Sequence, residues 1–203
     1  MKTAKSLMCL SIFTALLAGQ PAKAEDAGKW LVRLRALDVV PQESSDVSIG
    51  GKVGLSSNVV PEVDVSYFFT PNLALELIAA TTKHNVKLKG SADLGDVWLL
   101  PPTLTLQYHF TQSDLVKPYV GAGINYTHFY NADPGALDSA HYSDSFGSVL
   151  QAGFDIPIKN NWYFNMDVKK IWLSTDVSFN RGAVTANVDI DPWIFGTGFG
   201  YRF

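Results

Sequence analysis

The sequence predicts an all-β fold, an eight-stranded antiparallel transmembrane β-barrel, on three observations. The N-terminus has the pattern of an export signal. Apolar and polar residues alternate along most of the remaining chain, which is typical of β-strands. Although 47% of the residues are hydrophobic, no segment after the signal contains the roughly 18 consecutive apolar residues that a membrane-spanning helix needs. A transmembrane β-barrel explains how a chain can be rich in apolar residues without a long apolar segment, because every second side chain of each strand faces lipid.

Residues 1–24 are predicted to be a cleaved signal peptide. Lys2 and Lys5 form a positive start, residues 7–18 are apolar, and the Ala-Lys-Ala at residues 22–24 is a cleavage pattern. The apolar run is too short to cross a membrane as a helix, which takes roughly 20 residues. The remaining chain is long enough for one domain.

The mature chain, residues 25–203, is expected to be a single transmembrane β-barrel domain that is acidic and free of cysteine. Cys9 is the only cysteine and leaves with the signal peptide, which excludes disulfides, thiolate nucleophiles and Cys-based metal sites. Loss of three signal-peptide lysines lowers the basic count from 16 to 13 against 19 acidic residues, so the net charge moves from −3 to −6. This charge argues against a nucleic-acid partner, because phosphate binding depends on Lys and Arg.

Apolar residues recur at every second position in eight segments, which predicts eight strands. The predicted strands lie near residues 30–37, 59–69, 73–82, 103–110, 118–128, 146–158, 162–175 and 184–203. The connections between them alternate between short and long, and one long connection, residues 83–102, is unusually apolar. In outer-membrane barrels the short turns face the periplasm and the long loops face outward.

A soluble sandwich or lipocalin-like barrel is the alternative, because alternating strands also build those folds. The apolar face, however, carries large side chains on nearly every strand, more than a small eight-stranded interior could hold. We therefore expect this face to contact lipid. One charged residue of the predicted strands, Lys170, falls at the alternate positions that are expected to face lipid, which we call the lipid parity. A β-bulge or a position near the headgroups would accommodate it.

The charged residues share the opposite parity and are expected to face the axis. Unpaired buried charges are costly, so we expect them to pair and to fill the lower barrel rather than line a water pore. This predicted network consists of Arg33, Arg35, Glu62, Asp64, Glu76, Asp155, Asp167, Lys169 and Arg202.

Four blocks of the mature chain resemble the OmpW family of outer-membrane proteins: Leu100–Leu104, Pro118–Thr127, Asp191–Trp193 and Gly200–Phe203. The resemblance implies an eight-stranded barrel in the bacterial outer membrane, with a narrow hydrophobic passage for small apolar compounds. The terminal aromatics Tyr201 and Phe203 look like the signal read by the barrel-assembly machinery, a feature that many outer-membrane proteins share.

The resemblance also implies a hydrophobic gate inside the barrel. In the family an aliphatic residue on the third strand and a tryptophan on the seventh form this gate. The aliphatic residue maps onto Ile78 of this sequence, but the tryptophan maps onto Lys169. The sequence therefore departs from the family at this gate.

A group of apolar residues near the outer mouth is the predicted ligand passage: Ile78, Ile171 and Leu173 on the inward parity, with Trp98 and Leu99 in the apolar loop. A concave apolar pocket of this kind binds hydrophobic ligands. The alternative is that these residues only pack the loops together. The expected partners are outer-membrane lipids and lipopolysaccharide, the barrel-assembly machinery and a small hydrophobic ligand.

An enzyme is not predicted. Barrel enzymes of this membrane need a serine activated by a histidine, and the four candidates, His84, His109, His128 and His141, do not share a strand face with a serine. Their scattered spacing does not predict a metal site either, and we expect no cofactor. The predicted function is binding or passage of small hydrophobic molecules across the outer membrane. The alternative is a structural or surface-interaction barrel that supports envelope integrity or serves as a phage or bacteriocin receptor.

Overall fold

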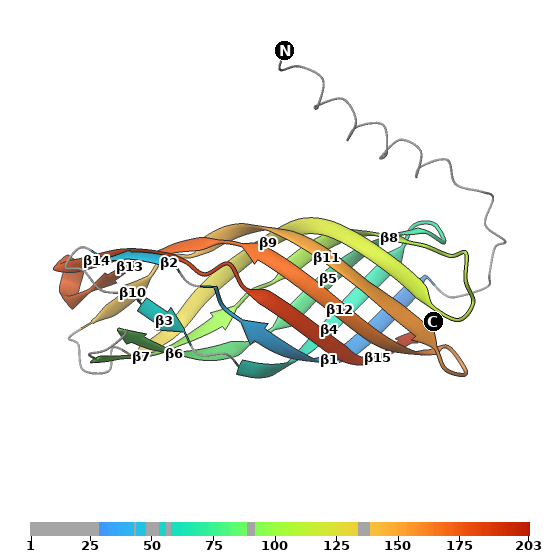
Figure 1. Cartoon of the computed structure of the whole chain (residues 1–203), viewed down its shortest axis with the longest axis horizontal. Helices are drawn as coiled ribbons and strands as arrows, with labels where there is room; N and C mark the ends of the chain where they lie inside the picture. Colours follow the sequence, from blue (N-terminus) through green and yellow to red (C-terminus); the bar gives the residue numbers. More distant parts are fainter. Residues whose placement is uncertain (1–28, 43, 48–52, 56–57, 89–91, 134–138) are drawn as a thin grey trace, which may run out of the picture.

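The structure, a computed structural model, describes residues 29–42, 44–47, 53–55, 58–88, 92–133 and 139–203. The predicted signal peptide lies outside these residues and stays a prediction. The described chain forms a long barrel that closes by pairing its first strand with its last (Figure 1). Trp30 N donates to Phe203 O at 3.0 Å, and Phe203 N donates to Trp30 O at 2.9 Å.

Eight antiparallel runs surround the axis, and four of them consist of two consecutive strands. The runs are β1 (Trp30–Val40), β4 (Asn58–Phe68), β5 (Leu73–Ala80) with β6 (Thr82–Leu88), β7 (Ala92–Leu100) with β8 (Thr103–His109), β9 (Lys117–Asp133), β11 (Ser145–Pro157), β12 (Trp162–Trp172) with β13 (Ser174–Phe179), and β14 (Val184–Asp189) with β15 (Trp193–Arg202). Short strands β2 (Ser44–Val47), β3 (Val53–Leu55) and β10 (Ala140–Tyr142) and a 3-10 turn at Asn180–Gly182 complete the described elements. The predicted eight-stranded antiparallel barrel is confirmed.

The two ends of the barrel differ. At one end, which we call the turn end, short connections join β4 to β5, β8 to β9 and β11 to β12, and β1 begins beside the end of β15. At the other, the loop end, the barrel sheet continues through β9-β7-β6-β3, and β10-β13-β14-β2 form a separate four-stranded sheet (Figure 1). The prediction of a loop at residues 83–102 was wrong, because β6 and β7 form a strand pair that lengthens the wall.

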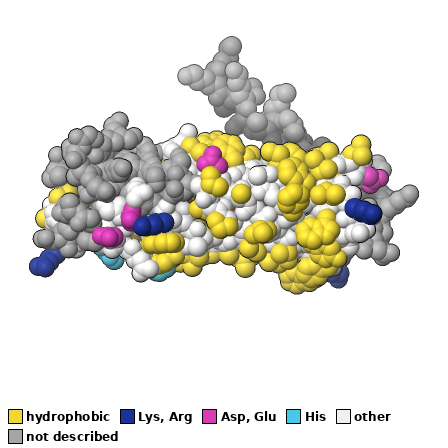
Figure 2. Space-filling model, turned by 90° about the horizontal axis from the view of Figure 1, so that it is seen from below, with side chains coloured by type: hydrophobic (Ala, Val, Ile, Leu, Met, Phe, Trp, Pro, Cys, Tyr) yellow, Lys and Arg dark blue, Asp and Glu magenta, His cyan; other side chains and the backbone are white. Residues whose placement is uncertain are grey.

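Side chains alternate between lipid and axis as the sequence predicts. On β1, Leu34 is 61% exposed, whereas the neighbouring Arg33 and Arg35 are buried. On β9, Val120 and Ile124 also point outward. Figure 2 shows hydrophobic side chains spread over the wall, with Lys and Arg gathered toward the two ends. Within the described ranges, no helix is long and apolar enough to cross a membrane. A wall that exposes large apolar side chains around an ion-paired interior is suited to lipid.

Lys170, which lies on the lipid parity of β12, has local polar partners. Its Nζ donates to Gln42 Oε1 at 3.0 Å and to Asp191 O at 2.5 Å, and it lies 5.3 Å from the centre of the Trp193 ring. These contacts occur where β14 gives way to β15. Asp191 adopts φ 35° there, and its Oδ1 accepts a hydrogen bond from Leu173 N at 2.9 Å. The Asp191–Trp193 block therefore forms an irregular break in the wall that also satisfies Lys170.

Candidate functional site

Buried ion pairs fill the lower barrel, on the side of the turn end. We call this layer the plug; it consists of Arg33, Arg35, Glu62, Asp64, Glu76, Asp155, Asp167 and Lys169. Arg33 lies 3.0 Å from Asp64 and donates to both oxygens of Asp155, at 2.8 and 3.2 Å. Arg35 lies 2.5 Å from Glu62 and donates to Asp167 at 2.7 Å. A forked guanidinium suits such pairing, because it offers five donors in a fixed plane.

Neutral polar side chains complete the plug. Thr105 Oγ1 donates to Glu76 Oε2 at 2.9 Å, Gln151 Nε2 donates to Asp167 Oδ2 at 2.7 Å, and Asn165 Nδ2 donates to Asp155 Oδ1 at 2.9 Å. All three residues are buried on the inward parity. The sequence analysis did not select them, although their parity was the available signal. Together with the ion pairs they occupy the axis, as expected where eight strands enclose only side chains.

Three predicted residues near the C-terminus, Tyr201, Arg202 and Phe203, lie at the turn end, below the plug. Arg202 was predicted to join the network, but its guanidinium lies 3.9 Å from the ring centre of Phe68 at the turn end. The reason is its position on β15, one inward step beyond Gly200, where Phe68, Ala74, Leu31 and Tyr163 form a small apolar cluster. Tyr201 and Phe203 face outward, and their role as an assembly signal stays a prediction.

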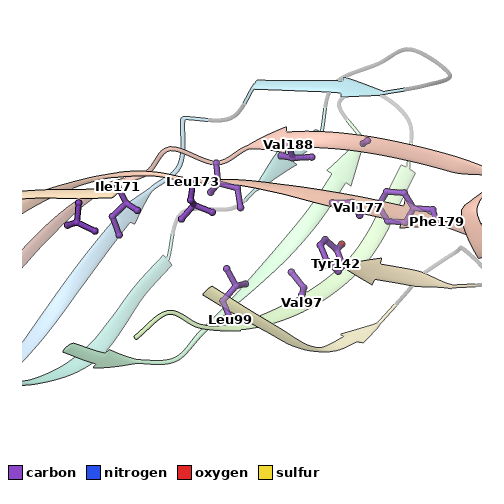
Figure 3. Packing of buried hydrophobic residues seen from close by; sticks show 11 residues of the cluster. Val97, Leu99, Tyr142, Ile171, Leu173, Val177, Phe179 and Val188 are labelled. Atoms are coloured by element: carbon purple, nitrogen blue, oxygen red, sulfur yellow. The ribbon is translucent and has the colours of Figure 1, made fainter. Parts of the chain in front are cut away.

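An apolar cavity of about 90 Å³ lies above the plug, toward the loop end. We call it the upper cavity. Of the predicted passage residues, Ile78, Leu99, Ile171 and Leu173 are buried and line it. Figure 3 shows Leu99 on one wall pointing across the interior toward Ile171 and Leu173 on the other. The structure therefore brings together four of the five residues that the sequence assigned to a ligand passage.

Trp98 is the exception and does not line the cavity. It is exposed on the outer surface, where its ring centre lies 6.2 Å from that of Tyr130. The assignment was wrong because it treated residues 83–102 as a loop. On a strand, adjacent side chains point to opposite faces, so Leu99 faces inward and Trp98 faces lipid.

The upper part of the cavity wall was missed in the sequence analysis. It is formed by buried residues, of which Tyr142, Val177 and Phe179 lie in segments that were expected to be loops and Val188 lies in the last predicted strand. Figure 3 shows these side chains around the same interior space. Alternation at Val177 and Phe179 was the available signal, but the segment is short and bounded by a turn.

The wall beside the cavity contains a break in the hydrogen-bond ladder. The β5–β8 pairing ends at Ile78 and Thr103, and the β6–β7 pairing starts at Thr82 and Leu99. Between these pairs, Pro101 and Pro102 face Ala79 and Ala80. Proline has no N–H to donate, so neither proline can supply a ladder bond to β5 or β6. We call this break the proline seam.

The prolines at the seam are held from the opposite side, by β9. Tyr126 N donates to Pro102 O at 3.0 Å, and Asn125 Nδ2 donates to Pro101 O at 3.3 Å. Ala80 and Pro101 both line the upper cavity. At the seam, therefore, Ala80 and Pro101 line the cavity at a point where the prolines donate no ladder bond.

Two of the candidate histidines, His109 and His128, contact neighbouring side chains of the barrel. His109 is buried, stacked on Tyr119 and next to Gln107 at 3.0 Å. His128 Nδ1 lies 2.9 Å from Asp144, in the connection between β10 and β11. Asp144 also accepts from Tyr126 OH at 2.6 Å and from Phe129 N at 3.1 Å. The Tyr126 hydroxyl and then the His128 imidazole hold the pKa of the Asp144 carboxyl at about 2.

In the described part of the chain, no group of three or more His, Cys, Asp or Glu side chains could hold a metal ion. The upper cavity and the plug form an apolar chamber above an ion-paired floor. Its lining can enclose an apolar molecule, and Ala80 and Pro101 of the proline seam belong to that lining.

Comparisons with known proteins agree with this architecture. The sequence model of the OmpW family matches residues 26–203. An uncharacterized outer-membrane protein of Sinorhizobium fredii, y4mB, is 43% identical over 86% of this chain and 80% of its own length. The crystal structure of the outer membrane protein OprG from Pseudomonas aeruginosa has a TM-score of 0.81 and 33% identity, covering 87% of this chain and 96% of its own. A Pseudomonas aeruginosa relative, 26% identical over 98% of this chain and 99% of its own, is named dibenzothiophene metabolism operon protein PahQ.

Proposed function

The chain belongs to the OmpW family of outer-membrane proteins, and on that premise we propose that it carries small apolar molecules from the cell surface into the outer membrane. The observation that supports this proposal is the upper cavity, an apolar chamber that opens above a buried ion-paired plug. Burial of apolar surface stabilises a hydrophobic ligand by roughly 25 cal/mol per Å² removed from water. The name of the relative PahQ, which refers to dibenzothiophene metabolism, is consistent with an apolar cargo.

The plug and the seam together favour a sideways route. The plug residues are almost fully buried and mutually bonded, so an apolar molecule that continued along the axis would have to displace ion pairs. At the proline seam the cavity wall is formed by Ala80 and Pro101, which carry no charge. Lipid beyond the seam is as apolar as the cavity, so an exit there involves no exposure of the cargo to water.

The experiment that tests this proposal is uptake of an apolar fluorescent dye into proteoliposomes that contain folded protein. Ile78→Asp places a charge in the cavity wall and should lower the uptake rate at least tenfold, because burying an unpaired carboxylate there is costly. Ile78→Leu, which conserves volume, should retain the rate. Heat-modifiable migration on gels confirms that both variants fold.

Unchanged uptake by folded Ile78→Asp protein would reject the cavity as the route. If a deletion strain also showed normal entry of apolar solutes but a weakened envelope, the alternative function, a structural or surface-interaction barrel, would be supported instead.

A further inference from the structure

The floor of the upper cavity is charged, although its walls are apolar. Glu62 and Lys169 belong to the plug and also line the cavity. Thr103 and Asn125 line the same level, but they are satisfied by each other, with Asn125 Nδ2 donating to Thr103 Oγ1 at 2.8 Å. The groups left to meet a ligand at the floor are therefore the Lys169 ammonium and the Glu62 carboxylate.

The Lys169 ammonium has at least one N–H donor that is available to a ligand. The side chain is 2% exposed, and Nζ lies 2.8 Å from Asp167 Oδ2 and 3.5 Å from Glu62 Oε2. Asp167 Oδ2 already accepts hydrogen bonds from Arg35 and Gln151, both at 2.7 Å. These two ion pairs occupy at most two of the ammonium's donors, and among the described residues Nζ has no third acceptor. An ammonium has three donors, and a buried donor without an acceptor is costly.

Glu62 restricts which acceptor can approach Lys169. Its Oε1 is bonded to Arg35 at 2.5 Å, whereas Oε2 has the 3.5 Å contact with Lys169. A ligand oxygen bonded to Nζ would therefore lie close to Oε2 and to Asp167. An anionic head group would be repelled by these two carboxylates. A hydroxyl would fit, because it can accept from Lys169 and donate to Glu62.

We propose that Lys169 and Glu62 form a head-group site, and that the preferred cargo is an amphiphile with an apolar chain and one uncharged, oxygen-bearing head such as a primary alcohol. This inference rests on the proposed function and specifies its substrate class. The chain of the ligand lies among Ile78, Ile171 and Leu173, and its oxygen lies at the floor.

Three probes of equal chain length test the head group: decane, 1-decanol and decanoate. Each is titrated into the folded protein in lipid nanodiscs, with concentrations expressed per lipid, while the methyl NMR signals of Ile78 and Ile171 report occupancy. A hydrogen bond to a charged donor corresponds to about tenfold in affinity. We expect saturable shifts with decane and 1-decanol, about tenfold tighter binding of 1-decanol than of decane, and weaker binding of decanoate than of 1-decanol.

Two variants separate the roles of the floor residues. Lys169→Met keeps the length of the side chain and should reduce the affinity for 1-decanol to that for decane, while decane binding is retained. Glu62→Gln keeps Lys169 and should improve the binding of decanoate relative to that of 1-decanol, because it removes one of the two negative charges beside Lys169. If either variant fails to fold, the comparison of the three probes on the unmodified protein still tests the head-group site.

Equal affinity for decane and 1-decanol in the unmodified protein would overturn the head-group site but leave the proposed function intact. The head-group site would also be overturned if Lys169→Met weakened both probes equally, or if decanoate bound more tightly than 1-decanol. No saturable shift with any probe would overturn the proposed function, and the head-group site with it.

Discussion

Gly200 lies directly opposite Arg33 in the pairing of β15 with β1, and a Cβ on Gly200 would lie 2.9 Å from Arg33 Cγ. The next inward pair toward the loop end is Gly198 and Arg35. Glycine on β15 thus provides the space in which the two arginines reach the axis. The plug depends on this match between large side chains on one strand and their absence on the next.

The two glycines should differ in their tolerance of alanine. A Cβ on Gly198 would collide with the backbone carbonyl of Leu34, whereas at Gly200 the nearest atoms belong to the side chains of Arg33 and Leu31, at 2.9 and 3.1 Å. We expect Gly198→Ala to lower the free energy of unfolding by more than about 2 kcal/mol, and Gly200→Ala by less than half as much. Urea unfolding in lipid vesicles measures both. Equal losses would show that the backbone contact does not set the limit.

Arg33 should be essential for stability. Arg33→Met leaves Asp155 without its arginine partner and leaves Asp64 with Arg35 alone, and removal of one member of a buried ion pair costs about 3–5 kcal/mol. Arg33→Lys keeps the charge but cannot bond both oxygens of Asp155, so we expect an intermediate loss. The same urea titration, followed by tryptophan fluorescence, distinguishes the three proteins. A methionine variant as stable as the unmodified protein would mean that the ion pairs do not hold the barrel.

A cross-link across the proline seam should block uptake. The flanking pairs place Ala79 opposite Pro102 on the outer face. In a chain with Cys9 replaced by serine, oxidation of Ala79→Cys/Pro102→Cys should abolish entry of apolar dye into proteoliposomes, and reduction should restore it. The control is Leu75→Cys/Leu106→Cys, which joins the same two runs at a regular pair. Full uptake through the oxidised seam would exclude the sideways route.

Asp144 should remain ionised in strong acid. Its pKa of about 2 in the folded protein lies below the ordinary value near 3.9, so its contacts contribute stability above pH 4 that is lost as the pH falls through 2. A carboxyl ¹³C titration should therefore give a midpoint near 2. Tyr126→Phe removes the hydroxyl that donates to Asp144 and should move the midpoint upward. A midpoint near 4 in the unmodified protein would show that these contacts are absent in lipid.

Much of the barrel was predictable because a strand in lipid must alternate. The inward positions of Arg33, Glu76 and Lys169 follow from parity alone, and so do those of three passage residues, Ile78, Ile171 and Leu173. Parity is lost where the chain is treated as a loop, which explains the error at Trp98. Partners across the barrel, such as Arg33 and Asp155, depend on the register of distant strands, and no local pattern encodes that register.

The central claim is that the barrel contains an apolar binding chamber, and residue-resolved photolabelling with a diazirine-bearing alkane tests it most directly. Ile171 and Trp172 are adjacent in the chain, but Ile171 faces the cavity whereas Trp172 faces the lipid. The labelling is performed in nanodiscs, with increasing amounts of unlabelled alkane as competitor. We predict that labelling of Ile171 saturates and is suppressed by the competitor, whereas labelling of Trp172 rises in proportion to the probe in the lipid. Labelling confined to Trp172 and other outward residues would contradict an apolar binding chamber inside the barrel.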